Sequence, residues 1–190
     1  MTLLGRLLKN RRAGETHTAW NLPNLRGPEL LALTSRHFGD GGSMPLEHCA
    51  KTIGGADLSP HLAWTPLPPG TAQLLLVVED IDVPMAKPAV HCLALIDPAA
   101  GHLEPGALAA RRPGPGVRVL RSTLGRGYHG PAPIKGHGPH RYTFQLFALA
   151  TPVDSARDAT PVDRARPRAL LPAITAPVLD RGRLTGVFER

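Results

Sequence analysis

The chain has 190 residues, a length that fits one domain with a substantial core. Aromatic residues make up only 4% of it, so aliphatic side chains must fill most of that core, and 20 Gly with 21 Pro predict short, often interrupted elements. The net charge of +7 comes without a basic stripe interleaved with aromatic residues, which argues against nucleic-acid binding. Because no run of about eighteen apolar residues occurs, no transmembrane segment is expected.

The first predicted element is a short amphipathic helix within residues 3–12. Leucines at positions 3, 4, 7 and 8 share one helical face, with basic residues opposite. Such a helix either contacts a membrane surface or a partner, or packs on its own domain or on a second copy in a homodimer; its shortness favours packing. The chain thus divides into a basic amphipathic extension, residues 1–26, and a single domain, residues 27–190. The apolar stretch is too short and too interrupted for a secretory signal, so a cytoplasmic location is expected.

The domain that follows has the alternation typical of β-strands. Strands are predicted at residues 29–35, 62–64, 73–79, 90–96, 140–149 and 184–188, the last as an edge strand. The runs at 73–79 and 90–96 are continuously apolar, as expected of central strands. Residues 39–43 predict a glycine turn, residues 100–127 a loop, and residues 162–174, cut by two prolines, at most short turns of helix.

Polar side chains stand where three of these strands end or begin. Asp80 shares a strand face with Val78, and His140 and Tyr142 share one with Phe144, because strand side chains alternate between two faces. These polar groups therefore lie on the strand faces that point into the core. An unpartnered polar group in an apolar setting costs about 1 to 3 kcal/mol, so they should satisfy one another or a ligand.

The same alternation places His91 on the face of Leu93 and Leu95, so a third strand can aim a titratable group inward. The opposite face of the strand at 140–149 carries positions 141, 143 and 145, which are polar. The first positions of this face are therefore expected to be exposed to solvent.

Five motifs occur in order along residues 31–150. They are Leu58-Ser59-Pro60-His61-Leu62-Ala63-Trp64, the Asp-x-Asp-x-Pro at 80–84, His91, Gly130-Pro131, and His140-Arg141-Tyr142. This ordered set resembles the phosphatidylethanolamine-binding protein family, in its bacterial Raf-kinase-inhibitor-like branch. The resemblance implies a mostly β fold, an antiparallel Greek-key β-sandwich with a few short peripheral helices. It also implies a small anion-accepting pocket, lined by Asp80, Asp82, Pro84, His91, Gly130, His140 and Tyr142.

Two positions depart from the family pattern. Cys92 stands where an aromatic residue usually follows the histidine, which predicts a looser flank to the pocket. Ile81 stands where proline is common between the two aspartates, which weakens the turn but keeps both carboxylates. Cys92 and Cys49 lie far apart without a C-x-x-C motif, so reduced, partly buried thiols are expected.

The sequence predicts neither a metal site nor a cofactor. His129, His137 and His140 fall within twelve residues, but they surround glycine and proline turns, so His129 and His137 are interpreted as loop residues instead of zinc ligands. His61 and His102 have no partner motif and are interpreted as surface residues.

Hydrolase chemistry has less support. No G-x-S-x-G motif occurs. Asp80, His91 and His140 are residue types used in acid-base catalysis, but no nucleophile or metal motif accompanies them. A non-enzymatic protein is therefore expected, with a weak hydrolase as the less favoured alternative.

Two carboxylates repel a phosphate ion, so Asp80 and Asp82 each need another task. They either orient His and Tyr side chains while His91, His140 and amides near Gly130 donate to phosphate, or they accept the ammonium group of a zwitterion such as ethanolamine phosphate. The leading hypothesis is a binding or regulatory protein for small phosphate-bearing ligands or phospholipid head groups. The alternative is an inhibitor of a kinase or protease that acts through surface loops such as residues 100–127.

Overall fold

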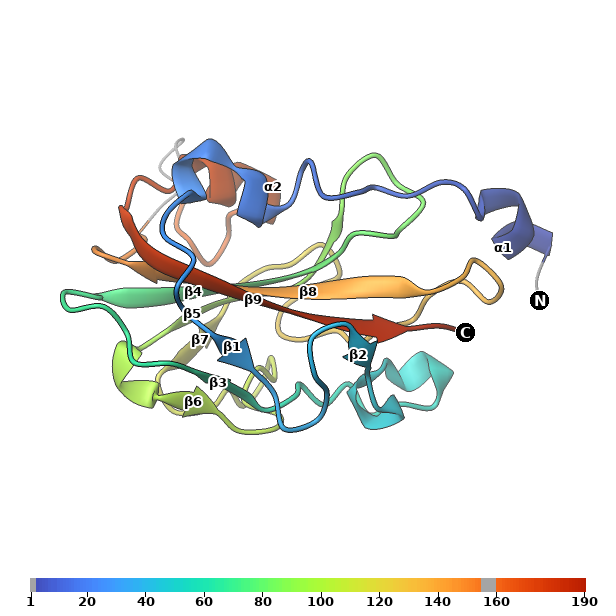
Figure 1. The fold of residues 1–190 in the computed structure, drawn as a ribbon, viewed down its shortest axis with the longest axis horizontal. Coiled ribbons are helices and arrows are strands. Elements are labelled where there is room, and N and C mark those ends of the chain that lie inside the picture. Colours follow the sequence, from blue (N-terminus) through green and yellow to red (C-terminus); the bar gives the residue numbers. More distant parts are fainter. Residues whose placement is uncertain (1–2, 155–159) are drawn as a thin grey trace.

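The computed structural model describes residues 3–154 and 160–190. Three long strands, β4 (Gln73–Asp80), β5 (Ala89–Ile96) and β8 (His140–Leu149), form the middle of a six-stranded sheet (Figure 1). The order across this sheet is β2-β9-β8-β4-β5-β7, completed by β2 (Gly42–Ser43), β7 (Val117–Val119) and β9 (Val178–Phe188). A three-stranded sheet has the order β1-β3-β6, from β1 (Leu33–Thr34), β3 (Leu62–Trp64) and β6 (His102–Leu103).

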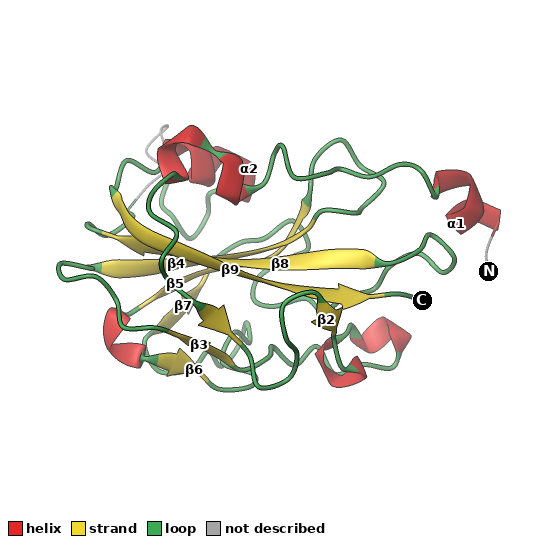
Figure 2. Ribbon diagram, viewed as in Figure 1, coloured by secondary structure: helices red, strands yellow, loops and turns green. Residues whose placement is uncertain are grey.

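The helical elements are short, in keeping with the proline content. One face of the large sheet is covered by η1 (Ala19–Asn21), η2 (Pro23–Leu25), α2 (Pro167–Leu170) and η6 (Leu171–Ala173) (Figure 2). The side of the small sheet carries η3 (Leu46–His48), η4 (Lys51–Ile53) and η5 (Pro98–Ala100), while α1 (Leu3–Leu8) lies beyond one end of the large sheet. None of the helices in the described ranges has the length and apolar character needed to span a bilayer.

The large sheet buries both of its faces, which explains the continuously apolar runs of β4 and β5. The first core, between the two sheets, includes Leu74, Leu76, Val78, Phe144 and Leu146. The second core, between the large sheet and the helical layer, includes Leu75, Val77, Leu93, Leu95, Leu170 and Leu171. Successive residues of one strand therefore enter different cores.

Most of the predicted strands are confirmed, with changes at the sheet edges. The first predicted strand, at 29–35, shortens to Leu33–Thr34, because the amide of Leu30 donates to the Asp180 side chain instead of to a strand. The strand predicted at 184–188 is confirmed as the end of β9, which begins earlier, at Val178. Its predicted edge position is wrong at Gly186 and Val187, where β2 pairs with it. The β2–β9 pair is parallel, so the mostly β fold is not purely antiparallel.

Candidate functional site

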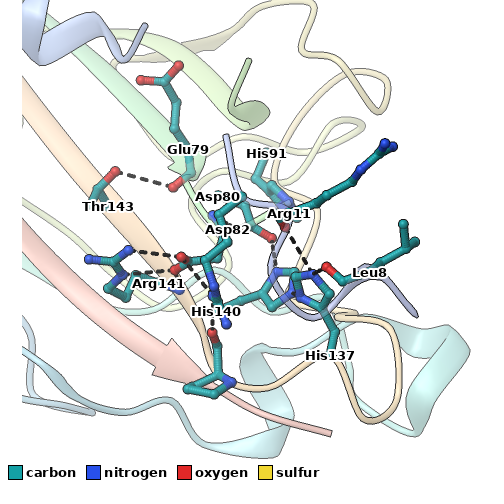
Figure 3. Close-up of polar contacts among 12 residues, drawn as sticks. Leu8, Arg11, Glu79, Asp80, Asp82, His91, His137, His140, Arg141 and Thr143 are labelled. Atoms are coloured by element: carbon teal, nitrogen blue, oxygen red, sulfur yellow. Dashed lines mark hydrogen bonds and ion pairs between the residues drawn. The ribbon is translucent and has the colours of Figure 1, made fainter. Parts of the chain in front are cut away.

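The end of β4 meets the starts of β5 and β8 at one end of the large sheet. Antiparallel pairing sets Asp80 opposite Tyr142 on β8 and opposite Ala89 on β5. His140 is two residues before Tyr142, and His91 is two residues after Ala89, so both rings lie at this end (Figure 3). Three strands thus bring two imidazoles, a phenol and a carboxylate together.

His91 reaches this group because β5 contains an irregularity. Residues 78 and 79 of β4 pair with residues 92 and 90 of β5, which leaves His91 as the extra residue of a bulge. The His91 ring centroid lies 5.2 Å from that of Tyr142, edge to face. The predicted shared face with Leu93 and Leu95 is therefore wrong, because these two leucines pack in the second core.

A chain of hydrogen bonds runs from Asp80 to the N-terminal segment (Figure 3). Nδ1 of His140 lies 2.7 Å from Oδ2 of Asp80, and Nε2 of His140 lies 2.7 Å from Nδ1 of His137. Nε2 of His137 lies 2.9 Å from the carbonyl oxygen of Leu8 and 3.1 Å from that of Arg11. Asp80, His137 and His140 are all buried, so this chain is shielded from water.

The backbone end of the chain fixes the direction of its hydrogen bonds. Carbonyl oxygens only accept, so Nε2 of His137 carries a proton, and in the neutral ring Nδ1 accepts from Nε2 of His140. One further proton must then lie between Nδ1 of His140 and Oδ2 of Asp80. His140 has no nitrogen left to donate to phosphate in this arrangement, contrary to the expectation from the sequence.

Asp82 organises a second polar cluster beside the first. Its carboxylate accepts hydrogen bonds of 2.8 Å from the side chain and the amide of Arg141, and it pairs with Nη1 of Arg12 at 2.8 Å. The Asp82 amide donates to Oδ1 of Asp80 at 2.8 Å. Burial alone would raise the pKa of Asp82, but the hydrogen bonds from Arg141 and Arg12 outweigh it and hold this pKa at about 2. Asp82 is therefore a fixed negative charge that binds both arginines.

Arg12 belongs to a segment that lies against this end of the sheet. Its guanidinium also donates to the carbonyl oxygen of Pro139 at 2.8 Å. The amides of residues 13 and 14 donate to the carbonyl oxygens of residues 83 and 81, at 2.9 and 2.8 Å. The segment is thus attached to both the turn after β4 and the loop before β8.

The predicted helix within residues 3–12 is confirmed as α1, and it contacts the chain's own loop before β8. The contact lies on the glycine side, where a Cβ at Gly5 would come within 2.3 Å of the carbonyl oxygen of Lys135. Leu3 and Leu7 remain 87% and 81% exposed. The helix therefore packs on its own domain through the side of Gly5, whereas Leu3 and Leu7 stay in solvent.

His91 and Tyr142 complete the buried group. Nδ1 of His91 donates to the carbonyl oxygen of His129 at 2.7 Å, which makes Nε2 an acceptor in the neutral ring. Burial lowers the pKa of His91, although the nearby Asp80 opposes this shift, so the ring is neutral near pH 7. Burial, and then the Asp80 carboxylate, raise the pKa of Tyr142, which stays a phenol. Near neutral pH Nε2 of His91 can accept a hydrogen bond but not donate one, so the role of phosphate donor expected from the sequence is confined to acid pH.

Gly130 and Pro84 contribute backbone instead of charge. The amide of Gly130 donates to Oδ1 of Asp57 at 2.8 Å. Contrary to the expectation from the sequence, this amide is therefore not free to bind an anion. A Cβ at Gly130 would lie 2.4 Å from the carbonyl oxygen of His48, which explains why glycine stands there. Pro84 is half-buried in the turn that follows β4.

The opposite face of the same strands locks the helical layer in place. Glu79 accepts hydrogen bonds from the amide of Ala19 at 2.7 Å and from Nε2 of Gln145 at 2.9 Å, and it pairs with Arg168 at 2.7 Å. Burial raises the pKa of Glu79, and the Arg168 charge opposes this shift. The prediction of a wet face at 141, 143 and 145 holds only for Arg141, because positions 143 and 145 are buried.

Other candidate chemistry lies away from this site. Cys49 and Cys92 are free and buried, as predicted, and burial raises the pKa of both thiols to about 12. Neither thiol is ionised near neutral pH. A surface groove of about 540 Å³ lies beside β6, among residues 99–107 and 112–115, and none of the predicted site residues lines it.

Three residues of the two clusters were not predicted from the sequence: Arg12, His137 and Arg141. His137 is in a loop, as predicted, but it is fully buried between His140 and the N-terminal segment. The spacing of His137 and His140 was the only local signal. The contact of Arg12 with residue 82 leaves no local signal in the sequence, because it joins distant parts of the chain.

Comparison with known proteins adds independent information. A family model described as phosphatidylethanolamine-binding protein matches residues 34–189. The protein LppC of Mycobacterium tuberculosis, described as a candidate lipoprotein, is 34% identical over 162 residues, which are 85% of this chain and 73% of LppC. A protein of Aquifex aeolicus described as UPF0098 is 32% identical over 125 residues, which are 65% of this chain and 71% of that protein.

Solved structures are similar over most of the chain. The Escherichia coli protein YbcL, described as a new member of the mammalian PEBP family, has a TM-score of 0.71 at 26% identity, over 84% of this chain and 98% of YbcL. The Chlamydia trachomatis protein CT736 has a TM-score of 0.68 at 24% identity, over 84% of this chain and 97% of CT736, and supports the fold.

Asp82→Asn tests whether this carboxylate is the anchor of both arginines. We expect the variant to lose about 2 kcal/mol of unfolding free energy at pH 7, since the pKa of Asp82 is held at about 2, below its ordinary 3.8. A lowered carboxyl pKa stabilises the fold above the unfolded-state value and ceases to do so as pH falls. The difference from wild type should therefore disappear between about pH 4 and about pH 2.

Urea denaturation at several pH values measures this difference. Asp97→Asn is the matched control: Asp97 is exposed and accepts only a local hydrogen bond from Ala99, so it should change stability by less than about 0.5 kcal/mol. A loss that is the same at every pH would contradict the role given to the Asp82 charge.

Proposed function

Because the chain belongs to the phosphatidylethanolamine-binding protein family, we propose that it is a non-enzymatic binding protein for small phosphate-bearing ligands or phospholipid head groups. The observation that carries this proposal is the convergence of Asp80, His91 and Tyr142 at the joined ends of β4, β5 and β8. Nε2 of His91 makes no hydrogen bond among the described residues, so it has an acceptor left for a ligand.

The charges around this end favour a ligand that carries both signs. Asp80 and neutral His91 accept hydrogen bonds, so they suit an ammonium group. Arg12 and Arg141 are partly exposed and supply positive charge beside Asp82, where a phosphate can meet them. A zwitterion such as ethanolamine phosphate satisfies both ends, whereas inorganic phosphate satisfies only the arginines.

Binding without turnover fits the state of the acid-base groups. Asp80, His140 and His137 are bonded to one another, and Nε2 of His91, the acceptor left for the ligand, is a weak base because burial lowers its pKa. Cys92, next to His91 in the sequence, is buried and keeps its proton, because burial raises its pKa to about 12. These groups can hold and orient a bound ligand, but they supply no nucleophile.

The N-terminal segment controls access to the inner part of this site. His137 occupies Nε2 of His140, and the carbonyl oxygens of Leu8 and Arg11 hold His137 in turn. A ligand that contacts His140 therefore has to break the contacts of His137 with Leu8 and Arg11. Its apparent affinity is reduced by the fraction of molecules in which this segment covers the site.

Asp80→Asn tests the ammonium contact. The substitution keeps the shape of the side chain but removes its charge, so ethanolamine phosphate should bind about tenfold more weakly, while inorganic phosphate should bind no more weakly than before. Isothermal titration of both ligands measures this, with wild-type dissociation constants of about 1 mM for the zwitterion. Asp97→Asn serves as control and should leave both affinities unchanged. Equal effects of Asp80→Asn on the two ligands would contradict the proposed orientation.

Gly5→Val tests the covering role of the N-terminal segment. A side chain at this position collides with the carbonyl oxygen of Lys135, so α1 should leave the loop before β8. Ethanolamine phosphate should then bind about tenfold more tightly, because less of the protein is in the covered state. The control is Leu7→Val, a β-branched substitution on the exposed side of α1. Titration of both variants decides the matter: unchanged or weaker binding by Gly5→Val would show that the segment does not cover the site.

A further inference from the structure

A second cluster of polar side chains lies outside the proposed ligand site. His37 comes from the loop between β1 and β2, whereas Glu47 and His48 belong to η3. One nitrogen or oxygen from each of the three side chains lies within 4.8 Å of the other two. The two imidazole ring centroids are 4.5 Å apart. Two segments thus point three potential electron-pair donors at one position.

His48 is the best defined of the three side chains. It is fully buried, and its Nδ1 donates to the carbonyl oxygen of Leu58 at 2.7 Å. Nε2 therefore carries the lone pair of the neutral ring, and it has no hydrogen-bond partner in the described structure. Oε1 of Glu47 lies 3.4 Å from this nitrogen. A proton or a cation between these two electron-rich atoms would relieve their repulsion.

We propose that His37, Glu47 and His48 bind a divalent transition-metal ion, with Zn²⁺ as the best match. Two imidazoles and one carboxylate form a ligand set that zinc uses with a fourth position left to water. The bond from Nδ1 of His48 to a backbone carbonyl is the contact that orients metal-binding histidines and fixes their tautomer. Calcium and magnesium match less well, because they prefer oxygen ligands alone.

His37 has to adjust when the ion binds. Its Nδ1 accepts a hydrogen bond of 3.2 Å from the amide of His61, so coordination either breaks this bond or turns the ring. The side chain is half-buried, which leaves room for this movement. Glu47 is exposed and reaches the position from the solvent side.

The metal position lies behind one wall of the proposed ligand site. The carbonyl oxygen of His48 accepts a hydrogen bond of 2.9 Å from the hydroxyl of Tyr128, and it lies against Gly130. An ion at this position ties the β1–β2 loop to the backbone that supports Gly130. This inference does not depend on the ligand proposed above, because it rests on a separate set of side chains.

Zinc titration of the full chain tests the proposal. Protein freed of metal with a chelator is titrated with zinc chloride by calorimetry at pH 7.5, and cobalt(II) absorption provides a second readout of a four-coordinate site. We expect one zinc ion per chain, with affinity reduced at least about tenfold in His37→Gln and in Glu47→Gln. Both positions are at least partly exposed, so these variants should keep the fold. His48→Asn should also lose zinc while keeping a donor to the Leu58 carbonyl.

His17→Gln is the matched control, because His17 is an exposed histidine outside the cluster. It should bind zinc as the wild type does. The assignment would be overturned if wild-type protein bound no zinc, or if His37→Gln and Glu47→Gln bound it as tightly as wild type.

Discussion

Buried polar groups at the end of β4 need partners, and the arrangement of the site follows from this requirement. Asp80 takes an imidazole and a backbone amide, while Asp82 takes two guanidinium groups and a second amide. These partners come from β8, from the turn after β4 and from the N-terminal segment. The bond between Leu8 and His137 joins residues 129 positions apart. Satisfying two carboxylates thus closes the chain around one end of its sheet.

Neighbouring residues of β4 perform different tasks because they point to opposite faces. Glu79 enters the side of the helical layer, where Arg168, Gln145 and the amide of Ala19 neutralise and fix it. Asp80 enters the side of the small sheet, beside two imidazoles and a phenol. The first carboxylate is fully used in holding the fold. Beside the second carboxylate lies Nε2 of His91, which has no hydrogen-bond partner within residues 3–154 and 160–190, and we therefore propose the ligand position on this face.

Local patterns predicted the longer strands and the family. They missed β2 in the predicted turn at 39–43 and β6 and β7 in the predicted loop at 100–127, because these short strands form only by pairing with distant segments. Alternation correctly placed Asp80, His140 and Tyr142 on one face, because β4 and β8 pair without interruption there. It failed for His91, since a bulge depends on the pairing of two strands. The contacts of the N-terminal segment use backbone carbonyls and one arginine, and backbone groups leave no trace in the sequence. The cluster of His37 with His48 joins a loop to η3 and carries no spacing motif.

The central claim is that a ligand with an ammonium and a phosphate group binds where β4, β5 and β8 meet, in place of the N-terminal cover. A crystal structure of the full chain soaked with ethanolamine phosphate tests this most directly. The account predicts the ammonium group beside Asp80 and His91, with Leu8 and Arg11 moved away from His137. Ligand found only elsewhere on the molecule, with the contacts of His137 to residues 8 and 11 intact, would contradict it.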